Sequence, residues 1–249
     1  MIFRAFSVLS VIMFGLCATE KLDILKTLNY TSSCKRASSD YNSCLKNRAE
    51  VIWPIFVKGL PAEFDLPPLD PFLYKYEKVV VDSGDLHGEI SVKNITVIGI
   101  KMIHFKWVRS HLNDDIFYLG CRYQIPQIDA EGIYEGHGTI AGFRFNTQAG
   151  YFNITMKGIR GMWNILGPVK NDTLIVKHFR ITPMIKNLKI YVDNSDNSEI
   201  MKLANMFVNE NWPILYRIIL PLAVEKFDTY FSNLVNPFFA KLSFSQIFP

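Results

Sequence analysis

The feature that most constrains the fold is a long segment near the C-terminus that is apolar on nearly every side. Helical spacing predicts a first short helix that begins near residue 197, and then a new helix that Asn211 caps, with Pro213 in its first turn. This last helix is predicted to run to about Val235 and to kink at Pro221. A helix that is apolar almost all round is buried on most sides, so the rest of the chain must supply an apolar surface around it.

The middle of the chain supplies that surface. Between about residues 74 and 192 the hydrophobic period changes to two, which predicts long strands with one apolar and one polar face. The alternation slips by one residue near Lys93 and Asn94, which indicates a bulge. Glycines recur through residues 132–143, where they permit the bends of a strongly curved sheet. The sequence therefore predicts an α+β fold, in which a curved antiparallel sheet wraps the C-terminal helix and leaves an apolar tunnel between them.

The N-terminus predicts the compartment. Residues 1–19 have a basic start at Arg4, an apolar run from Phe6 to Cys17 and small residues after it, as in a secretory signal peptide. The run is too short to span a bilayer of about 30 Å. We therefore expect a secreted, extracellular protein in which residues 20–249 form a single domain without stable membrane insertion. The net charge is only +4, and the Lys and Arg residues are scattered along the chain, which argues against nucleic-acid binding.

Cysteines and sequons fit an oxidising compartment. Such a compartment favours a disulfide, and Cys34 with Cys44 would close a small loop. Cys121 lies on the apolar face of its strand and is expected to be a buried, inert thiol. The candidate glycosylation sites are the N-x-T sequons at Asn29, Asn94, Asn153 and Asn171.

A proline-rich stretch, GLPAEFDLPPLDPF (residues 59–72), separates a predicted helix from the strands. The helix is expected from Asp40 to about Val57. The stretch could be a polyproline ligand, half of a carboxylate pair or a structural joint. The joint is favoured because the stretch connects two ordered elements, and it is then expected to shape one end of the tunnel. Asp65 and Asp70 are expected to be turn or capping groups.

Four motifs, in order along nearly the whole chain, resemble those of one protein family. They are CKRASSDYNSCL (34–45), GLPAEFDLPPLDPF (59–72), YQIPQIDAEGIYEGHGTI (123–140) and NENWPILYRIILPLAVEKF (209–227). Together they resemble the insect takeout and juvenile-hormone-binding proteins. In that family the first motif is a short disulfide loop, and the last has an asparagine-tryptophan start and an internal proline.

The resemblance implies both a fold and a function. The implied fold is a super-roll of the TULIP type, with a long helix, a highly curved antiparallel sheet and an internal hydrophobic tunnel. The implied function is extracellular carriage of a small lipophilic ligand, such as juvenile hormone, another terpenoid or a fatty acid, without a cofactor. The moth hormone carriers have a second disulfide in the later part of the chain. Here only Cys121 remains there, which places the chain nearer the takeout branch.

The candidate ligand-binding residues are the apolar side chains predicted to line the tunnel, and ordinary core packing is the alternative for each of them. Tyr123, Tyr134 and Trp107 are the candidates for a polar handle, because each combines a ring with one hydrogen-bonding group. The full set is Phe105, Trp107, Phe117, Leu119, Tyr123, Tyr134, Phe152, Ile154, Met156, Ile218, Leu222, Phe227 and Phe231.

Two other classes of function stay open. The chain could bind a protein partner, such as a cell-surface receptor, with the tunnel filled as a plain core. A lipid-ester hydrolase is less favoured, because the sequence has no G-x-S-x-G elbow and no H-E-x-x-H pair. His87, His104 and His137 are expected at the surface, and no catalytic or metal-binding residue is predicted. We expect a monomer that is not an enzyme.

Overall fold

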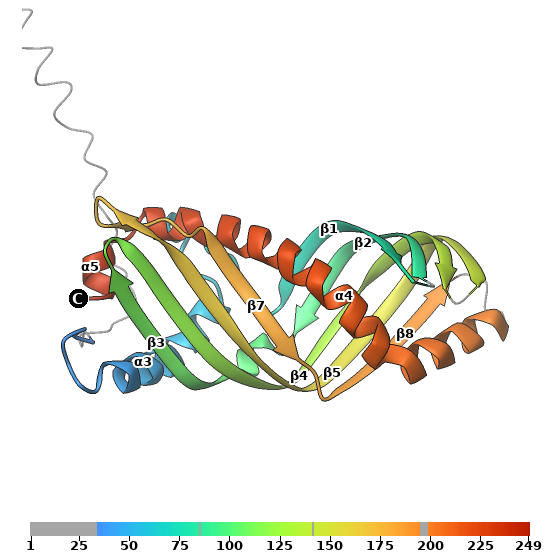
Figure 1. Ribbon diagram of the computed structural model, residues 1–249, viewed down its shortest axis with the longest axis horizontal. Coiled ribbons are helices and arrows are strands. Elements are labelled where there is room, and N and C mark those ends of the chain that lie inside the picture. Colours follow the sequence, from blue (N-terminus) through green and yellow to red (C-terminus); the bar gives the residue numbers. More distant parts are fainter. Residues whose placement is uncertain (1–33, 85, 141, 195–198) are drawn as a thin grey trace, which may run out of the picture.

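The computed structural model describes residues 34–84, 86–140, 142–194 and 199–249. Within them a curled sheet and a long helix lie along each other (Figure 1). The predicted signal peptide and Asn29 lie outside the described residues. In chain order the elements are α3 (Tyr41–Val57), η1 (Ala62–Phe64), β1 (Phe72–Ser83), β2 (Leu86–Ile98), η2 (Ile100–Met102), β3 (His104–Asn113), β4 (Ile116–Ile140), β5 (Phe143–Lys170), β6 (Thr173–Leu174), β7 (His178–Met184), β8 (Asn187–Asn194), α4 (Glu199–Ala240) and α5 (Phe244–Ile247).

The sheet is antiparallel and is built around two long strands, β4 and β5, which pair with each other along almost their whole length. On its other side β4 pairs with β3 and then with β2, while β5 pairs with β8 and then with β7. The sheet therefore has two halves. The α3 half consists of β3, β7, residues 116–125 of β4 and residues 159–170 of β5. The β1 half consists of β1, β2, β8, residues 127–140 of β4 and residues 143–157 of β5.

The sheet changes its inward face where the two halves join, at Pro126 and Gly158. In the α3 half the buried apolar side chains of β4 and β5 have odd numbers, as for Ile125 and Ile159, whereas in the β1 half they have even numbers, as for Phe152. Pro126 has no N–H for the ladder, and Gly158 has a φ of +62°, which favours glycine. Both strands thus reverse their faces at the same level, and the sheet curls. The pairing of β2 with β4 changes register between Lys93 and Thr96, which is the predicted bulge near Lys93.

α4 is one helix of 42 residues that lies along the open side of the curled sheet (Figure 1). The prediction of two successive helices, with a cap at Asn211 and an end near Val235, is wrong. Asn211 lies inside α4 and donates its Nδ2 to the Phe207 carbonyl at 2.8 Å. Pro213 is likewise internal, which costs about 3 kcal/mol in an isolated helix, so contacts with the sheet must offset it. No helix in the described part of the chain has the length and apolar composition that a membrane crossing requires.

The predicted burial of this helix needs a correction. The curled sheet is a half-barrel, and α4 closes its open side without being enclosed. Leu203, Met206 and Ile214 on the N-terminal half of α4 are 63%, 57% and 60% exposed. The general prediction is nevertheless confirmed: the fold combines a curved antiparallel sheet with a long C-terminal helix that lies along it.

Asparagine side chains fasten α4 to the edge of the sheet. Asn209 donates to the Ile190 carbonyl at 2.6 Å and accepts from the Ile190 N–H at 2.9 Å. One amide thereby satisfies both backbone groups of an edge residue, which would otherwise be unpaired. Among the described residues, this pair of hydrogen bonds occurs three times: Asn205 with Val192, Asn209 with Ile190, and Asn236 with Val176.

A carboxylate completes this attachment. Asp228 of α4 accepts a hydrogen bond from the Phe179 N–H at 2.6 Å, and it lies 2.9 Å from His178 Nδ1 and 3.3 Å from Arg180 Nε. Partial burial acts to raise the pKa of Asp228, but the hydrogen bonds from His178, the Phe179 N–H and Arg180 hold it below its ordinary value. The helix is therefore tied to β7 by a charged group.

The N-terminal part of the described chain closes the α3 half. α3 spans the predicted range, and Asp40 occupies its N-cap position without a side-chain capping bond. The predicted disulfide between Cys34 and Cys44 is present. Cys121 is 2% exposed and free, as predicted, and burial raises the pKa of its thiol to about 12.

The proline-rich stretch is confirmed as a structural joint. Asp70 Oδ2 accepts from the N–H groups of Gly99 and Lys101 at 3.0 and 2.7 Å, and so caps the 3₁₀ turn η2. Asp65 has a positive φ of 52° at the end of η1 and forms an ion pair with Lys241. The joint is thus fixed to η2 on one side and to the C-terminus of α4 on the other.

Candidate functional site

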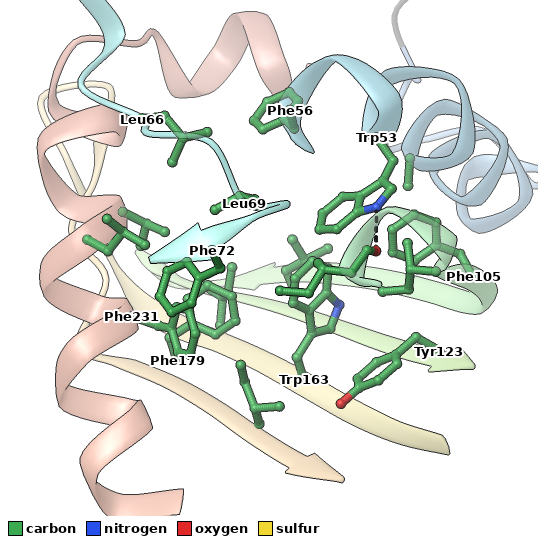
Figure 2. Close-up of a pocket in the computed structure, with 18 of the residues that line it drawn as sticks. Trp53, Phe56, Leu66, Leu69, Phe72, Phe105, Tyr123, Trp163, Phe179 and Phe231 are labelled. Atoms are coloured by element: carbon green, nitrogen blue, oxygen red, sulfur yellow. Dashed lines mark hydrogen bonds between the residues drawn. The ribbon is translucent and has the colours of Figure 1, made fainter. Parts of the chain in front are cut away.

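The described residues line a partly open apolar cavity of about 370 Å³ in the α3 half. It lies between the inner face of the sheet, α3, the joint and the C-terminal half of α4 (Figure 2). Small-molecule sites usually measure about 300–1,000 Å³, so the cavity is large enough to be one.

The lining residues are regularly spaced along each element. α3 and α4 each contribute one stripe at intervals of three and four residues, and the strands contribute alternate residues. From the helices come Ala49, Ile52, Trp53, Phe56, Phe231, Leu234, Val235, Phe238 and Phe239. From the sheet and the loops come Leu66, Leu69, Phe72, Ile100, Ile103, Phe105, Leu119, Tyr123, Ile125, Ile128, Trp163, Ile165, Phe179 and Ile181.

Trp163 is the centre of the aromatic wall. Its ring centroid lies 5.8 Å from that of Trp53, 6.1 Å from Phe105, 6.4 Å from Tyr123 and 5.5 Å from Phe179. Aromatic pairs at such distances contribute about 0.5–1.5 kcal/mol each beyond their buried area. The network couples α3, β3, β4, β5 and β7, so the wall is a preformed surface.

The indole groups of the lining already have partners. Trp53 donates its Nε1–H to the Ile100 carbonyl at 3.2 Å (Figure 2). The Trp163 side chain hydrogen-bonds to the sulfur of Cys121 and lowers the thiol pKa, against the larger effect of burial. Neither indole is therefore free to bind another group.

Tyr123 differs from the two indoles. It is 6% exposed, and its hydroxyl lies over Gly161, where a Cβ would come within 2.5 Å of it. The hydroxyl makes no hydrogen bond to any described residue. Because every fully buried side-chain N or O atom in the described part of the chain has a partner, this hydroxyl must border accessible space, and Tyr123 is one of the residues that line the cavity. Burial, and then the neighbouring Tyr216, raises the pKa of Tyr123, so it stays a proton donor.

Four of the predicted lining residues meet at this cavity: Phe105, Leu119, Tyr123 and Phe231. Phe117 instead belongs to the packed core, where it is 0% exposed and contacts Phe244 and Phe248 at centroid distances of 4.9 and 4.6 Å. The role of the four residues in binding a ligand stays a prediction.

Trp107 lies away from the cavity. A bulge between Phe105 and Trp107 interrupts the alternation predicted for β3, so Val108 follows Phe105 into the interior. The Trp107 ring packs under the guanidinium of Arg109 at 4.8 Å. The sequence could not show this, because a bulge shifts the face of every later residue in the strand.

The other predicted residues lie in the β1 half or on α4, outside the cavity lining. Met156 packs against the cluster of Tyr123, Ile125 and Ile159 at the junction of the two halves. Phe227 lies 6.0 Å from Phe231 and is 40% exposed. The remaining residues of this group are Tyr134, Phe152, Ile154, Ile218 and Leu222.

Sequence reasoning missed the residues that complete the enclosure. Trp53 and Phe56 were visible as part of an apolar helical stripe, but nothing in the stripe shows that it faces a cavity. Leu66, Leu69 and Phe72 of the joint have no periodicity that would mark them. They line the cavity because the joint folds back over it, which is a long-range contact.

Two of the predicted surface features can be placed, the sequons and the histidines. The sequon residues Asn94 and Asn171 are exposed, and Asn153 is half-buried; their glycosylation stays a prediction. His87, His104 and His137 are exposed, as expected. Asp114 and Asp115 form the turn between β3 and β4.

A comparison with solved structures supports the fold. The crystal structure of Epiphyas postvittana Takeout 1 is similar over 87% of this chain and 99% of that chain, with a TM-score of 0.73 and 17% sequence identity. At that identity the likeness concerns the fold. A lipopolysaccharide binding protein structure matches 78% of this chain and 39% of that chain, with a TM-score of 0.30 and 11% identity. A search of curated proteins finds no match.

The family comparison covers nearly the whole chain. The model of the haemolymph juvenile hormone binding protein (JHBP) family matches residues 10–249. This range includes the joint, both halves of the sheet and the long helix, and so every element around the cavity. The chain belongs to the haemolymph juvenile hormone binding protein family.

Proposed function

We propose that this protein is a carrier that binds one small lipophilic molecule in the cavity of the α3 half. The observation that carries the proposal is a cavity of about 370 Å³ with an apolar lining, to which Tyr123 contributes the one side chain with an unpaired hydroxyl. A protein-binding module with a filled core would have no reason to maintain such a space, because an empty apolar cavity lowers stability. Family membership supports the same function.

The physics of the lining supports a hydrophobic ligand. Burying apolar surface contributes about 25 cal/mol per Å², so removal of roughly 300 Å² of ligand surface from water gives several kcal/mol before entropic costs. The aromatic wall around Trp163 is already packed, so little ordering is required when the ligand enters.

Tyr123 defines the chemistry of the preferred ligand. Its hydroxyl can donate one hydrogen bond into an otherwise apolar space, which favours a hydrocarbon body with one acceptor, such as an ester, epoxide, ketone or carboxyl oxygen. Terpenoid hormones and fatty acids both fit this description. Ligands with several polar groups would leave some of them buried and unpaired, at a cost of about 1–3 kcal/mol each.

We propose further that the carrier acts outside the cell as a monomer. The signal-like residues 1–19, the disulfide between Cys34 and Cys44, and the exposed sequon residues Asn94 and Asn171 support secretion. The proposal is compatible with a receptor that recognises the loaded carrier, and it requires no cofactor.

A cavity-filling variant tests the proposal. Ala49 of α3 borders the cavity, so Ala49→Phe places a benzyl group in the ligand space without adding charge. The control is Ala62→Phe, which adds the same group at an exposed position in η1. An apolar environment-sensitive fluorophore should bind the wild type and Ala62→Phe, and should bind Ala49→Phe at least tenfold more weakly.

Two results would overturn the proposal. Equal fluorophore affinity in Ala49→Phe and Ala62→Phe, with both variants folded by circular dichroism, would place binding elsewhere. Turnover of a lipid ester above the buffer rate, lost in Ala49→Phe, would replace the carrier with a hydrolase.

A further inference from the structure

The outer face of the α3 half has an unusual charge composition. The strand segments 104–113, 116–125, 159–170 and 178–184 contain no Asp or Glu. They contain six basic residues: Lys106, Arg109, Arg122, Arg160, Lys170 and Arg180. The whole chain has a formal net charge of only +4, so these strands hold an excess that the rest of the protein offsets. Because the alternate positions of these strands form the apolar interior, the charges project to the outer face.

Strand register places three of these arginines on one diagonal. Arg109 of β3 is paired with Gly120, two residues from Arg122 on β4; Arg122 is paired with Met162, two residues from Arg160 on β5. With about 4.8 Å between strands and about 3.3 Å per residue, neighbouring members of the diagonal are about 8 Å apart. All three are exposed. We call Arg109, Arg122 and Arg160 the arginine diagonal.

The arginine diagonal has no neutralising partner. On the β1 half, two lysines have such partners: Lys78 pairs with Glu89 at 2.8 Å, and Lys93 with Glu135 at 2.6 Å. Among the described residues no ion pair involves the arginine diagonal. The positive potential on this face is therefore available to an external anion.

Apolar side chains are interspersed with these charges. Trp107 packs on Arg109, while Met184 and Leu166 are 65% and 37% exposed on the neighbouring strands. A sulfated or phosphorylated polymer would be bound by the basic side chains alone. A bilayer surface contacts basic groups with its headgroups, and it also accommodates Trp, Met and Leu side chains at the acyl boundary. The mixture therefore favours a membrane surface over a soluble polyanion.

We propose that the outer face of the α3 half is a peripheral docking surface for anionic lipid bilayers. The arginine diagonal contacts lipid phosphates and carboxylates through planar, bidentate guanidinium groups, and Trp107, Leu166 and Met184 lie at the interface. The contact is reversible adsorption by strands, without insertion of a helix. It requires no ligand in the cavity and so is independent of the proposed carrier function.

Charge arithmetic gives the expected size of the effect. Each Lys or Arg near an anionic bilayer strengthens partitioning about fivefold. Neutralising three arginines together should weaken partitioning roughly a hundredfold. Since surface charges are screened over about 8 Å at physiological ionic strength, binding should also fall steeply as salt is added.

The experiment is co-sedimentation of the full-length mature protein with vesicles. One set of vesicles is phosphatidylcholine alone, and the other contains phosphatidylcholine with about 30 mol% phosphatidylserine. At about this fraction, phosphatidylserine gives the bilayer a strong negative surface potential. The test variant is Arg109→Gln, Arg122→Gln and Arg160→Gln combined. The matched control is Lys58→Gln, Lys75→Gln and Lys202→Gln combined, which removes the same charge from three exposed positions outside this face.

We expect the wild type and the lysine variant to bind anionic vesicles, with at most a few-fold difference, and neither to bind neutral ones. The arginine variant should lose about a hundredfold while it keeps wild-type fluorophore binding in the cavity. The proposal is overturned if the wild type does not bind anionic vesicles at low salt. It is also overturned if both triple variants lose equally, or if heparin binds the arginine diagonal while vesicles do not.

Discussion

Replacing Tyr123 by Phe removes the only hydroxyl among the residues that line the cavity and leaves the ring in place. In most proteins a buried Tyr→Phe change breaks a hydrogen bond and costs about 0.5–1.5 kcal/mol. Here no described residue accepts from or donates to this hydroxyl. A water molecule could not substitute well, because an ordered water needs two to four polar partners and the apolar lining provides no others.

The expected effect on stability is therefore zero or favourable. The hydroxyl is partly desolvated without a partner, so its removal should leave the free energy of unfolding unchanged or raise it by up to about 1 kcal/mol. For a domain of this size that is a rise of at most about 2–4 °C in Tm. Urea unfolding of the ligand-free protein, monitored by tryptophan fluorescence, measures it.

The same variant separates two classes of ligand. A ligand with an oxygen acceptor should bind about 2- to 12-fold more weakly to Tyr123→Phe, the equivalent of one net hydrogen bond, while a hydrocarbon of similar size should bind unchanged. Tyr118→Phe is the control, because the Tyr118 hydroxyl donates to Asn164 Oδ1 at 2.6 Å outside the cavity. It should lose about 0.5–1.5 kcal/mol of stability and no affinity. A destabilisation of Tyr123→Phe above about 1 kcal/mol, or equal weakening of both ligands, would refute the reasoning.

Three further variants test the attachment of the elements around the cavity. The pKa of Asp228 is depressed in the folded protein, so its contribution to stability is present above the unfolded pKa of about 4 and is lost as pH falls through the folded pKa. Asp228→Asn should therefore be less stable than the wild type by about 1–2 kcal/mol at pH 7. A difference in the free energy of unfolding that stays constant down to about pH 3 in urea titrations would contradict this. Asn209→Leu should cost about 1–3 kcal/mol and abolish the hydrogen-exchange protection of the Ile190 amide, because both backbone groups of that residue lose their partner. Replacing Cys34 and Cys44 by Ser should cost about 2–3 kcal/mol in thermal unfolding, as expected for a loop with a sequence separation of 10, and an unchanged Tm would show that the bridge adds nothing.

The sequence predicts those parts of the fold that depend on local pattern. Period-two alternation identifies the strands, helical spacing identifies α3 and most of α4, and Gly59 with the prolines identifies the joint. The bulge near Lys93 is visible because the apolar phase slips there. In each case the pattern arises within one element, so it can be recognised from a single sequence.

The parts that fail depend on contacts between elements. A local rule ends a helix at Asn211 and Pro213, but α4 continues because Asn205 and Asn209 are bonded to β8. Alternation places Trp107 inside, but one bulge turns it outward. Exposure of Ile214 follows from the half-barrel shape of the sheet, which no helical periodicity encodes.

The candidate site is likewise only partly predictable from the sequence. Phe105, Leu119, Tyr123 and Phe231 are predictable as apolar residues on inward faces. That they border open space, while the equally apolar Phe117 is sealed among Phe244 and Phe248, depends on how well distant elements fill the volume between them. Pattern gives the face of a residue, and packing decides whether that face lines a core or a cavity.

The most direct test of the carrier function is to ask what the protein contains when it is purified without denaturation. Native mass spectrometry, followed by organic extraction and mass analysis, measures whether a small molecule accompanies the chain and how many copies bind. The cavity predicts one apolar molecule per chain, with a single oxygen-containing group, released by organic solvent and displaced by an apolar fluorophore. A chain of bare protein mass that yields no lipid on extraction and binds no apolar fluorophore would contradict the account.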